Sequence, residues 1–195
     1  MSKLYFRYGA MNCGKSTALI QVAHNYEERG MNILVMKPQV DSKGKDNIVS
    51  RIGASRKVDV LVSWDFNIYD FISGLIKEGK GPDCILVDEV QFLKANQVDQ
   101  LLYIAVELNI PIICYGLRTD FQMNGFEGSG RLLLIAHSIE ELKTICRCGK
   151  KATQNARKIN GEFVFVGEQI AIDSFDKVSY ESLCSECYIK MSRIK

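Results

Sequence analysis

The chain has 195 residues, a length typical of one domain or of one domain with a small appendage. Apolar residues make up 47% of it, enough for a buried core, while 25% are charged. The net charge of +2 gives no reason to expect binding to nucleic acid or to a membrane. No apolar run approaches the roughly 18 residues of a membrane-spanning helix, and the first residues lack the apolar core of a signal peptide. We therefore expect a cytoplasmic protein.

Strand and helix signals alternate through the first two thirds of the chain. Short apolar runs predict strands, and apolar residues at helical spacing predict the helices between them. In chain order the expected elements are a strand at 3–8, a helix at 16–29, strands at 32–36 and 58–62, a helix at 66–76, a strand at 84–87, a helix at 98–105 and a strand at 110–115. Residues 39–57 are polar and basic, and we expect them to form a mobile loop.

This alternation predicts an α/β fold, a parallel sheet with helices on both faces. The wholly apolar run at 84–87 is expected to be a buried central strand. In such a sheet the ligand binds at the carboxyl ends of the strands. The predicted strands end at Gly9, Asp88 and Tyr115, so chemistry is expected there.

Residues 9–16 match the glycine-rich phosphate loop at every defined position. They are Gly9, Ala10, Met11, Asn12, Cys13, Gly14, Lys15 and Ser16. Backbone N–H groups of such a loop surround phosphate oxygens, and the following helix adds the positive end of its dipole. Lys15 is expected to contact the β- and γ-phosphates and Ser16 to bind Mg²⁺, so ATP and Mg²⁺ are predicted ligands. The alternative, a chance glycine-rich turn, is disfavoured by the strand before the loop and the helix after it.

Two carboxylates, Asp88 and Glu89, close the predicted central strand. In phosphate-loop proteins an acid at this place reaches the bound Mg²⁺, so Asp88 is the predicted magnesium-side carboxylate. Glu89 is the predicted general base that takes a proton from the attacking nucleophile. Because neighbouring side chains on a strand point to opposite faces, both reach one site only where the chain begins to turn. The alternative is a solvated strand end without a role.

The pattern changes after about residue 140, where short β-like runs at 153–159 and 162–166 lie between two cysteine pairs. Cys146 and Cys148 form one pair and Cys184 and Cys187 the other, which suits a tetrahedral, structural zinc site. An odd total of 7 cysteines in a cytosolic chain argues against a disulfide framework. Four unrelated buried thiols are the alternative. We expect a phosphate-loop nucleotide-binding domain at 1–140 and a zinc-binding domain at 141–195.

The phosphate loop, the acidic strand end at 88–92, the segment 115–121 and the two cysteine pairs together resemble the thymidine kinase family of bacteria and animal cytosol. The resemblance covers almost the whole chain. It implies a RecA-like sheet, a zinc-bearing lasso domain, and transfer of the ATP γ-phosphate to the 5′-hydroxyl of thymidine, giving dTMP for DNA synthesis. It also implies a homotetramer that the end product dTTP inhibits.

The same resemblance assigns further residues. Glu89 matches the catalytic base, and Gln91 joins Asp88 in the nucleotide-binding set. The residues that match positions enclosing the nucleoside are Met11, Leu117, Phe121, Phe126 and Tyr180. The stretch 170–180 lacks the glycine-rich turn of the family, so no backbone contact to the base is assigned there. Arg51 stands where a histidine is expected and receives no role, while Arg118 is either a partner for phosphate charge or a solvated arginine.

Two other classes of function compete with the nucleoside kinase. A phosphate-loop ATPase could use its zinc module to bind nucleic acid or a protein, and a nucleotide sensor would need no base. Nucleic-acid binding would require a basic stripe with stacking aromatic residues. The basic residues of the zinc region, which we interpret as a solvated face, are Lys143, Arg147, Lys150, Lys151, Arg157 and Lys158.

Overall fold

The computed structural model describes residues 1–39, 46–169 and 177–193. Its centre is a sheet of six strands in the order β5-β2-β6-β7-β1-β8, and each neighbouring pair is parallel. The strands are β1 (Leu4–Tyr8), β2 (Ile33–Pro38), β5 (Val60–Val62), β6 (Cys84–Val87), β7 (Ile112–Gly116) and β8 (Ser138–Glu141). This confirms the predicted α/β class and the interior position of β6.

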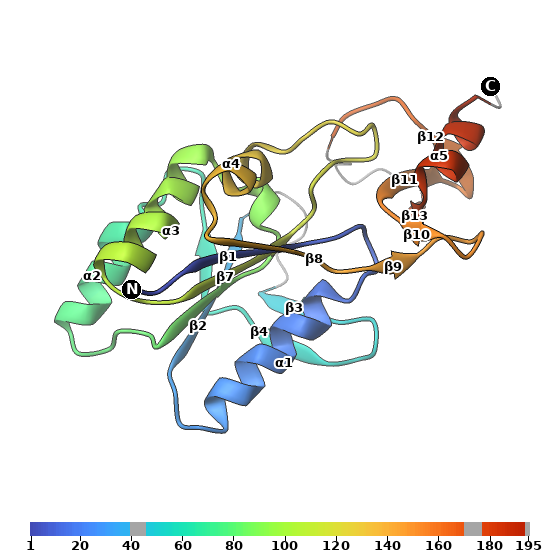
Figure 1. Ribbon diagram of the computed structural model, residues 1–195. Coiled ribbons are helices and arrows are strands. Elements are labelled where there is room, and N and C mark those ends of the chain that lie inside the picture. The colour runs from blue at the N-terminus through green and yellow to red at the C-terminus, as the bar shows by residue number, and fades with distance from the viewer. Residues whose placement is uncertain (40–45, 170–176, 194–195) are drawn as a thin grey trace.

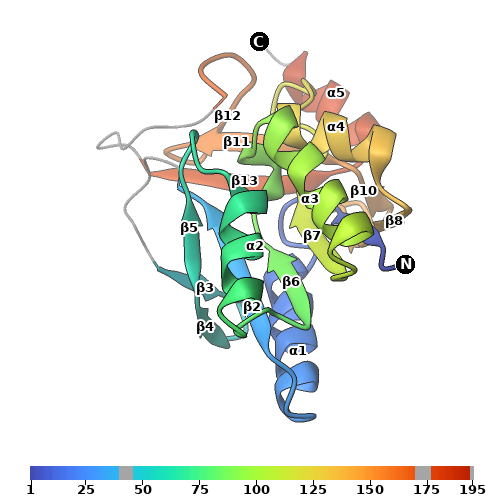
Figure 2. The ribbon, with the colours of Figure 1, turned by 90° about the vertical axis from the view of Figure 1, so that its left-hand side faces the viewer.

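Helices cover both faces of this sheet (Figure 1, Figure 2). Helix α1 (Lys15–Glu27) lies on one face, and the other carries α2 (Ile68–Lys77), α3 (Ala95–Glu107) and α4 (Glu127–Ile135). The alternation of β6 side chains builds both layers, because successive residues of a strand point to opposite faces. Cys84 and Leu86 belong to the cluster that includes Leu19 of α1, whereas Ile85 and Val87 belong to the cluster of α3.

The loop predicted for residues 39–57 is wrong over its second half. Strands β3 (Asn47–Val49) and β4 (Ser55–Lys57) form an antiparallel hairpin there. The hairpin is anchored by Ile48, which is 2% exposed and packs in the cluster of α1. One buried apolar side chain thus outweighs the polar composition of the segment. Residues 40–45 of the predicted loop lie outside the described residues.

The sequence did not predict α4 or β8. Glycines at 128 and 130 argue against a helix, yet α4 needs Gly128, because a Cβ there would lie 2.7 Å from the carbonyl oxygen of Leu93. Strand β8 reads Ser-Ile-Glu-Glu and lies at the edge of the sheet, where polar side chains face solvent. No apolar run therefore marks it.

The C-terminal part forms a separate small sheet in the order β12-β11-β13, beside a β9–β10 hairpin and helix α5. The bounds are β9 (Thr144–Ile145), β10 (Lys151–Ala152), β11 (Gln154–Ile159), β12 (Glu162–Val164), β13 (Val178–Leu183) and α5 (Ser185–Ser192). The predicted strands at 153–159 and 162–166 are confirmed as β11 and β12. The domain division after residue 140 stays a prediction, and β8, which ends at Glu141, pairs with β1 in the main sheet. Over the described ranges, no helix is both long enough and apolar enough to cross a membrane.

Candidate active site

The phosphate loop connects the end of β1 to the start of α1, as the sequence predicts. Two of its residues have left-handed backbone, Asn12 with φ 67° and Gly14 with φ 84°. Gly9 is needed for space, because a Cβ there would lie 2.5 Å from both Cys13 Sγ and the carbonyl oxygen of Leu142. The two glycines thus serve different purposes: Gly14 permits the turn into α1, and Gly9 permits close packing behind the loop.

The ammonium group of Lys15 lies against the loop itself. Its Nζ donates hydrogen bonds to the carbonyl oxygens of Ala10, at 3.0 Å, and Gly9, at 3.3 Å. The loop therefore carries a positive charge at the N-terminus of α1, where the helix dipole also favours an anion.

A cavity of about 310 Å³ opens beside the loop and brings together four separate segments. They are the phosphate loop with the start of α1, the turn of the β3–β4 hairpin, the end of β6 and the end of β7. The lining residues are Met11, Asn12, Gly14, Lys15, Ser16, Thr17, Val49, Ser50, Arg51, Ile52, Glu89 and Leu117. The predicted base thus shares one cavity with the predicted phosphate-binding residues.

Asp88 and Glu89 occupy different environments. Asp88 is 4% exposed, and its burial together with the charge of Glu89 raises the pKa of its carboxyl to about 7. Glu89 has φ 50°, so the chain leaves the strand direction at this residue. This turn explains how Glu89 lines the cavity although Asp88 precedes it directly on the strand.

Gln91 connects Glu89 to the end of β7. It lies in η1 (Val90–Phe92), is 2% exposed, and donates a hydrogen bond from Nε2 to the Glu89 carboxylate. Its Oε1 accepts the backbone N–H of Leu117 at 3.1 Å. A Cβ on Gly116 would lie 2.7 Å from this Oε1, so glycine leaves the room that the amide needs. The nucleotide contact assigned to Gln91 stays a prediction; its described contacts orient the Glu89 side chain.

The predicted nucleoside-enclosing residues divide into two groups. Met11 and Leu117 line the cavity. Phe121, Phe126 and Tyr180 are not among its lining residues in the described part of the chain. Phe126 packs edge-on against Phe92, with ring centroids 5.5 Å apart. Their contact with a substrate stays a prediction.

Arg157 lies between Phe121 and Tyr180. Its guanidinium carbon is 3.6 Å from the centre of the Phe121 ring, and its Nε donates to the Tyr180 hydroxyl at 3.1 Å. Arg157 is only 4% exposed, so the interpretation of this residue as part of a solvated basic face was wrong. The aromatic faces and two backbone carbonyls, of Glu168 and Gln169, replace the water it would otherwise bind.

Residues 50 and 51 were not among the predicted site residues, yet both line the cavity. Ser50 is 4% exposed, and its Oγ has no hydrogen-bond partner within the described residues. Arg51 is exposed at the tip of the hairpin. The polar composition of residues 39–57 could not show that Ser50 and Arg51 line the cavity beside the phosphate loop. Arg118 instead stacks on Tyr8, with its guanidinium carbon 5.7 Å from the ring centre.

The four predicted zinc ligands, Cys146, Cys148, Cys184 and Cys187, form a second site, with all sulfur atoms within 4.8 Å of one another. A tetrahedron with Zn–S bonds of about 2.3 Å separates its sulfurs by about 3.8 Å, so the four thiols fit zinc. Gly149, with φ 83°, donates its N–H to the Cys146 carbonyl at 2.8 Å and closes a tight turn. Burial acts to raise the pKa of Cys146, but hydrogen bonds from the backbone of Cys148 and Cys184 and from the thiols of Cys148 and Cys187 together lower that pKa to about 7.

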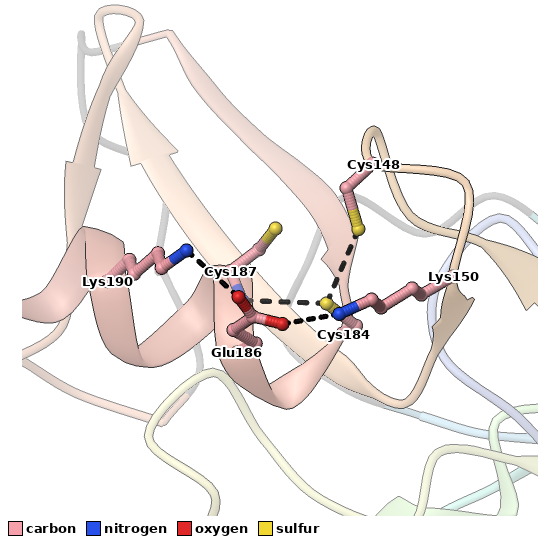
Figure 3. Close-up of polar contacts among 6 residues, drawn as sticks. All are labelled: Cys148, Lys150, Cys184, Glu186, Cys187 and Lys190. Carbon is pink, nitrogen blue, oxygen red and sulfur yellow. Dashed lines mark hydrogen bonds and ion pairs between the residues drawn. The ribbon is translucent and has the colours of Figure 1, made fainter.

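Ion pairs reinforce the cysteine site (Figure 3). Glu186, in the first turn of α5, pairs with Lys150 at 2.5 Å and with Lys190 at 2.9 Å. Lys150 belongs to the turn that carries Cys148, so this contact joins the two cysteine-bearing segments. The Glu186 side chain is exposed, with 52% of it accessible to solvent, which limits the contribution of these pairs to stability.

Fold and site together define an α/β protein with a phosphate-loop sequence, a carboxylate in the cavity beside that loop, and four cysteines close enough together to hold a metal ion. The model of the family described as "Thymidine kinase" matches residues 2–188. The chain therefore belongs to the thymidine kinase family, and it is a nucleoside kinase. This outcome favours the predicted kinase over the ATPase and the sensor.

Individual relatives agree with the family match. A thymidine kinase of Shewanella oneidensis is 48% identical over 186 residues, which cover 94% of this chain and 95% of that protein. A thymidine kinase of Coxiella burnetii is 47% identical over 186 residues, which cover 94% of this chain and 93% of that protein. Among solved structures, AMPPCP-bound DnaA from Aquifex aeolicus has a TM-score of 0.40 at 17% identity, covering 73% of this chain and 41% of that one. That likeness is too weak to support an argument.

Proposed function

We propose that the chain transfers the γ-phosphate of ATP to the 5′-hydroxyl of thymidine in the cavity beside the phosphate loop. The observation that carries this proposal is that Glu89 lines the same cavity as Lys15 and Ser16. A base for the hydroxyl and the groups for the phosphates thereby lie within reach of one bound substrate pair.

The phosphate loop, Glu89 and the residues that support them have proposed roles. The N–H groups of the phosphate loop, apart from those of Gly9 and Met11, which donate within the protein, hold the phosphates together with the ammonium of Lys15. They offset the phosphate charge, because phosphoryl transfer depends on positioning and charge stabilisation. Glu89, oriented by Gln91, accepts the proton of the 5′-hydroxyl. Ser16 and Asp88 would hold Mg²⁺, which neutralises charge on the β- and γ-phosphates when bound.

The assignments around the thymine base rest on the resemblance of the chain to its family. Met11 and Leu117 would enclose the thymine base from the cavity wall, and Phe121, Phe126 and Tyr180 would complete the enclosure. Zinc at the four cysteines would be structural, because four protein ligands leave no open coordination position. The homotetramer, the inhibition by dTTP and the cytoplasmic location also stay predictions.

Incubation of the purified protein with Mg-ATP and each common nucleoside tests the proposed function. We expect rapid formation of the monophosphate from thymidine and little from purine nucleosides or cytidine. Hydrolysis of ATP without phosphorylation of any nucleoside, above all if DNA or RNA stimulates it, would overturn the proposal.

A further inference from the structure

We propose that Asn155 and Ser182 are positioning residues that hold the phosphate loop in its nucleotide-binding conformation through hydrogen bonds to the main chain of Met11. This inference rests on the proposed role of the loop as the ATP site. Both residues belong to the small C-terminal sheet, in a part of the chain that the nucleotide-binding motif does not include.

These hydrogen bonds involve both main-chain polar groups of Met11. Its N–H donates to Asn155 Oδ1 at 2.7 Å, and its carbonyl oxygen accepts a hydrogen bond from Ser182 Oγ. Asn155 on β11 and Ser182 on β13 are directly opposite each other in the antiparallel register. A single cross-strand pair therefore supplies both the acceptor and the donor, in a fixed relative position.

Asn155 also holds a third segment. Its Nδ2 donates to the carbonyl oxygen of Thr119, after the end of β7, at 2.9 Å. Asn155 is 3% exposed, so replacing it without a substitute leaves buried polar groups without partners. An amide is the side chain that fits, because a carboxylate accepts hydrogen bonds but cannot donate one to Thr119.

The phosphate loop needs such a support because of its own composition. Two glycines give it conformational freedom, and its N–H groups bind phosphate only when they point to one place. A loop that must be ordered upon binding loses affinity for its ligand. Met11 lies in the middle of the loop, four residues before Lys15, where fixing both main-chain groups restricts the residues on either side.

Titration calorimetry of the full-length protein with a non-hydrolysable ATP analogue and Mg²⁺ tests the inference. Ser182→Ala removes one hydrogen bond, and we expect its Kd for the analogue to rise about 2- to 12-fold, the range that one neutral hydrogen bond represents. Asn155→Asp should bind still more weakly, because it loses the bond to Thr119 and adds a negative charge near the phosphates. Ser182→Thr keeps the hydroxyl and should restore most of the affinity.

Two exposed residues provide matched controls. Ser179→Ala makes the same change as Ser182→Ala at an exposed position of β13, and Asn25→Asp makes the same change as Asn155→Asp at an exposed position of α1. Both should bind the analogue like the wild type. In steady-state kinetics the Asn155 and Ser182 variants should raise the KM for ATP more than they lower kcat.

A purely structural role gives a different pattern. Variants that melt at lower temperature but bind the analogue with unchanged Kd would overturn the inference and leave the proposed function intact. Failure of the wild-type protein to bind the analogue would overturn the proposed function, and the inference with it.

Discussion

At the scale of single residues, Glu89 carries the sharpest prediction. Glu89→Gln keeps the size of the side chain but removes the group that accepts the proton of the 5′-hydroxyl. We expect kcat to fall at least about 100-fold, as is typical when a general base is lost. The KM for ATP should change little, since the phosphate contacts belong to the loop. Steady-state phosphorylation of thymidine measures both values.

Glu78→Gln is the matched control, because Glu78 is exposed at the end of α2 and pairs only with Lys80 among the contacts described for it. It should retain the activity of the wild type. Normal turnover of the Glu89→Gln protein would remove Glu89 from the role of base.

Gln91 acts through Glu89, so its replacement should lower turnover without abolishing it. Gln91→Leu removes the hydrogen bonds to Glu89 and Leu117, and we expect kcat to fall about 10-fold, the effect of losing one to two hydrogen bonds. Gly116→Ala should act in the same direction, because the new Cβ would displace the Gln91 amide. Combining the two should cost less than the sum of both, since they disturb one contact. Additive losses would show that Gly116 acts on something other than Gln91.

At the scale of elements, α4 depends on one of its two glycines. Gly128→Ala places a Cβ against the backbone carbonyls of Val90 and Leu93, which cannot move aside as a flexible side chain could. We expect a loss of about 1–3 kcal/mol in the free energy of unfolding, the usual effect of overpacking. Denaturant unfolding monitored by circular dichroism measures it.

Gly130→Ala is the control within the same helix. Nothing lies within 4 Å of a Cβ at Gly130, so the change should be neutral or stabilise the helix by up to about 1 kcal/mol. Equal destabilisation by both substitutions would contradict the packing argument.

The β3–β4 hairpin borders the cavity in which the nucleotide is proposed to bind. Its turn lines the cavity through Ser50 and Arg51, so a bound nucleotide should shield it. We expect trypsin to cut more slowly after Arg51 when an ATP analogue and thymidine are present, while cutting after the exposed Lys80, which does not line the cavity, stays unchanged. Mass spectrometry of the fragments gives both rates. Equal cutting after Arg51 with and without ligands would show that the hairpin does not respond to them.

Elements that carry their own signal in the sequence were predictable. The run Cys84–Val87 is wholly apolar because both faces of β6 are covered, and its predicted bounds match the structure. The phosphate loop and the cysteine pairs were found because their chemistry requires fixed spacing. By contrast, α4, the hairpin and the burial of Arg157 depend on contacts between distant segments. Ile48 packs near α1, Gly128 packs against the backbone at Leu93, and Arg157 packs on Phe121. No local sequence pattern indicates any of these contacts.

At the scale of the whole molecule, the cysteine site should control the stability of the C-terminal part. Its buried cluster is small, and two of its members, Cys146 and Cys184, are themselves predicted ligands. We expect about one zinc per chain by elemental analysis. Cys148→Ser should lower that content, whereas Cys13→Ser, in the phosphate loop, should leave it unchanged. Removal of the metal with a chelator should lower the melting temperature, because binding energy at such a site contributes to folding.

Equal zinc content in the Cys148→Ser and wild-type proteins would exclude Cys148 as a ligand. An unchanged melting temperature after complete removal of the metal would show that the C-terminal part folds without it.

The hydrogen bonds from Asn155 and Ser182 to Met11 also affect which residues of the family can change during evolution. Both of its hydrogen bonds end on main-chain atoms, which every residue type other than proline offers alike. The side chain at position 11 can therefore vary during evolution without loosening the junction between the two parts of the chain. Since that side chain also lines the cavity, selection can alter substrate preference there while the assembly of the enzyme is inherited unchanged.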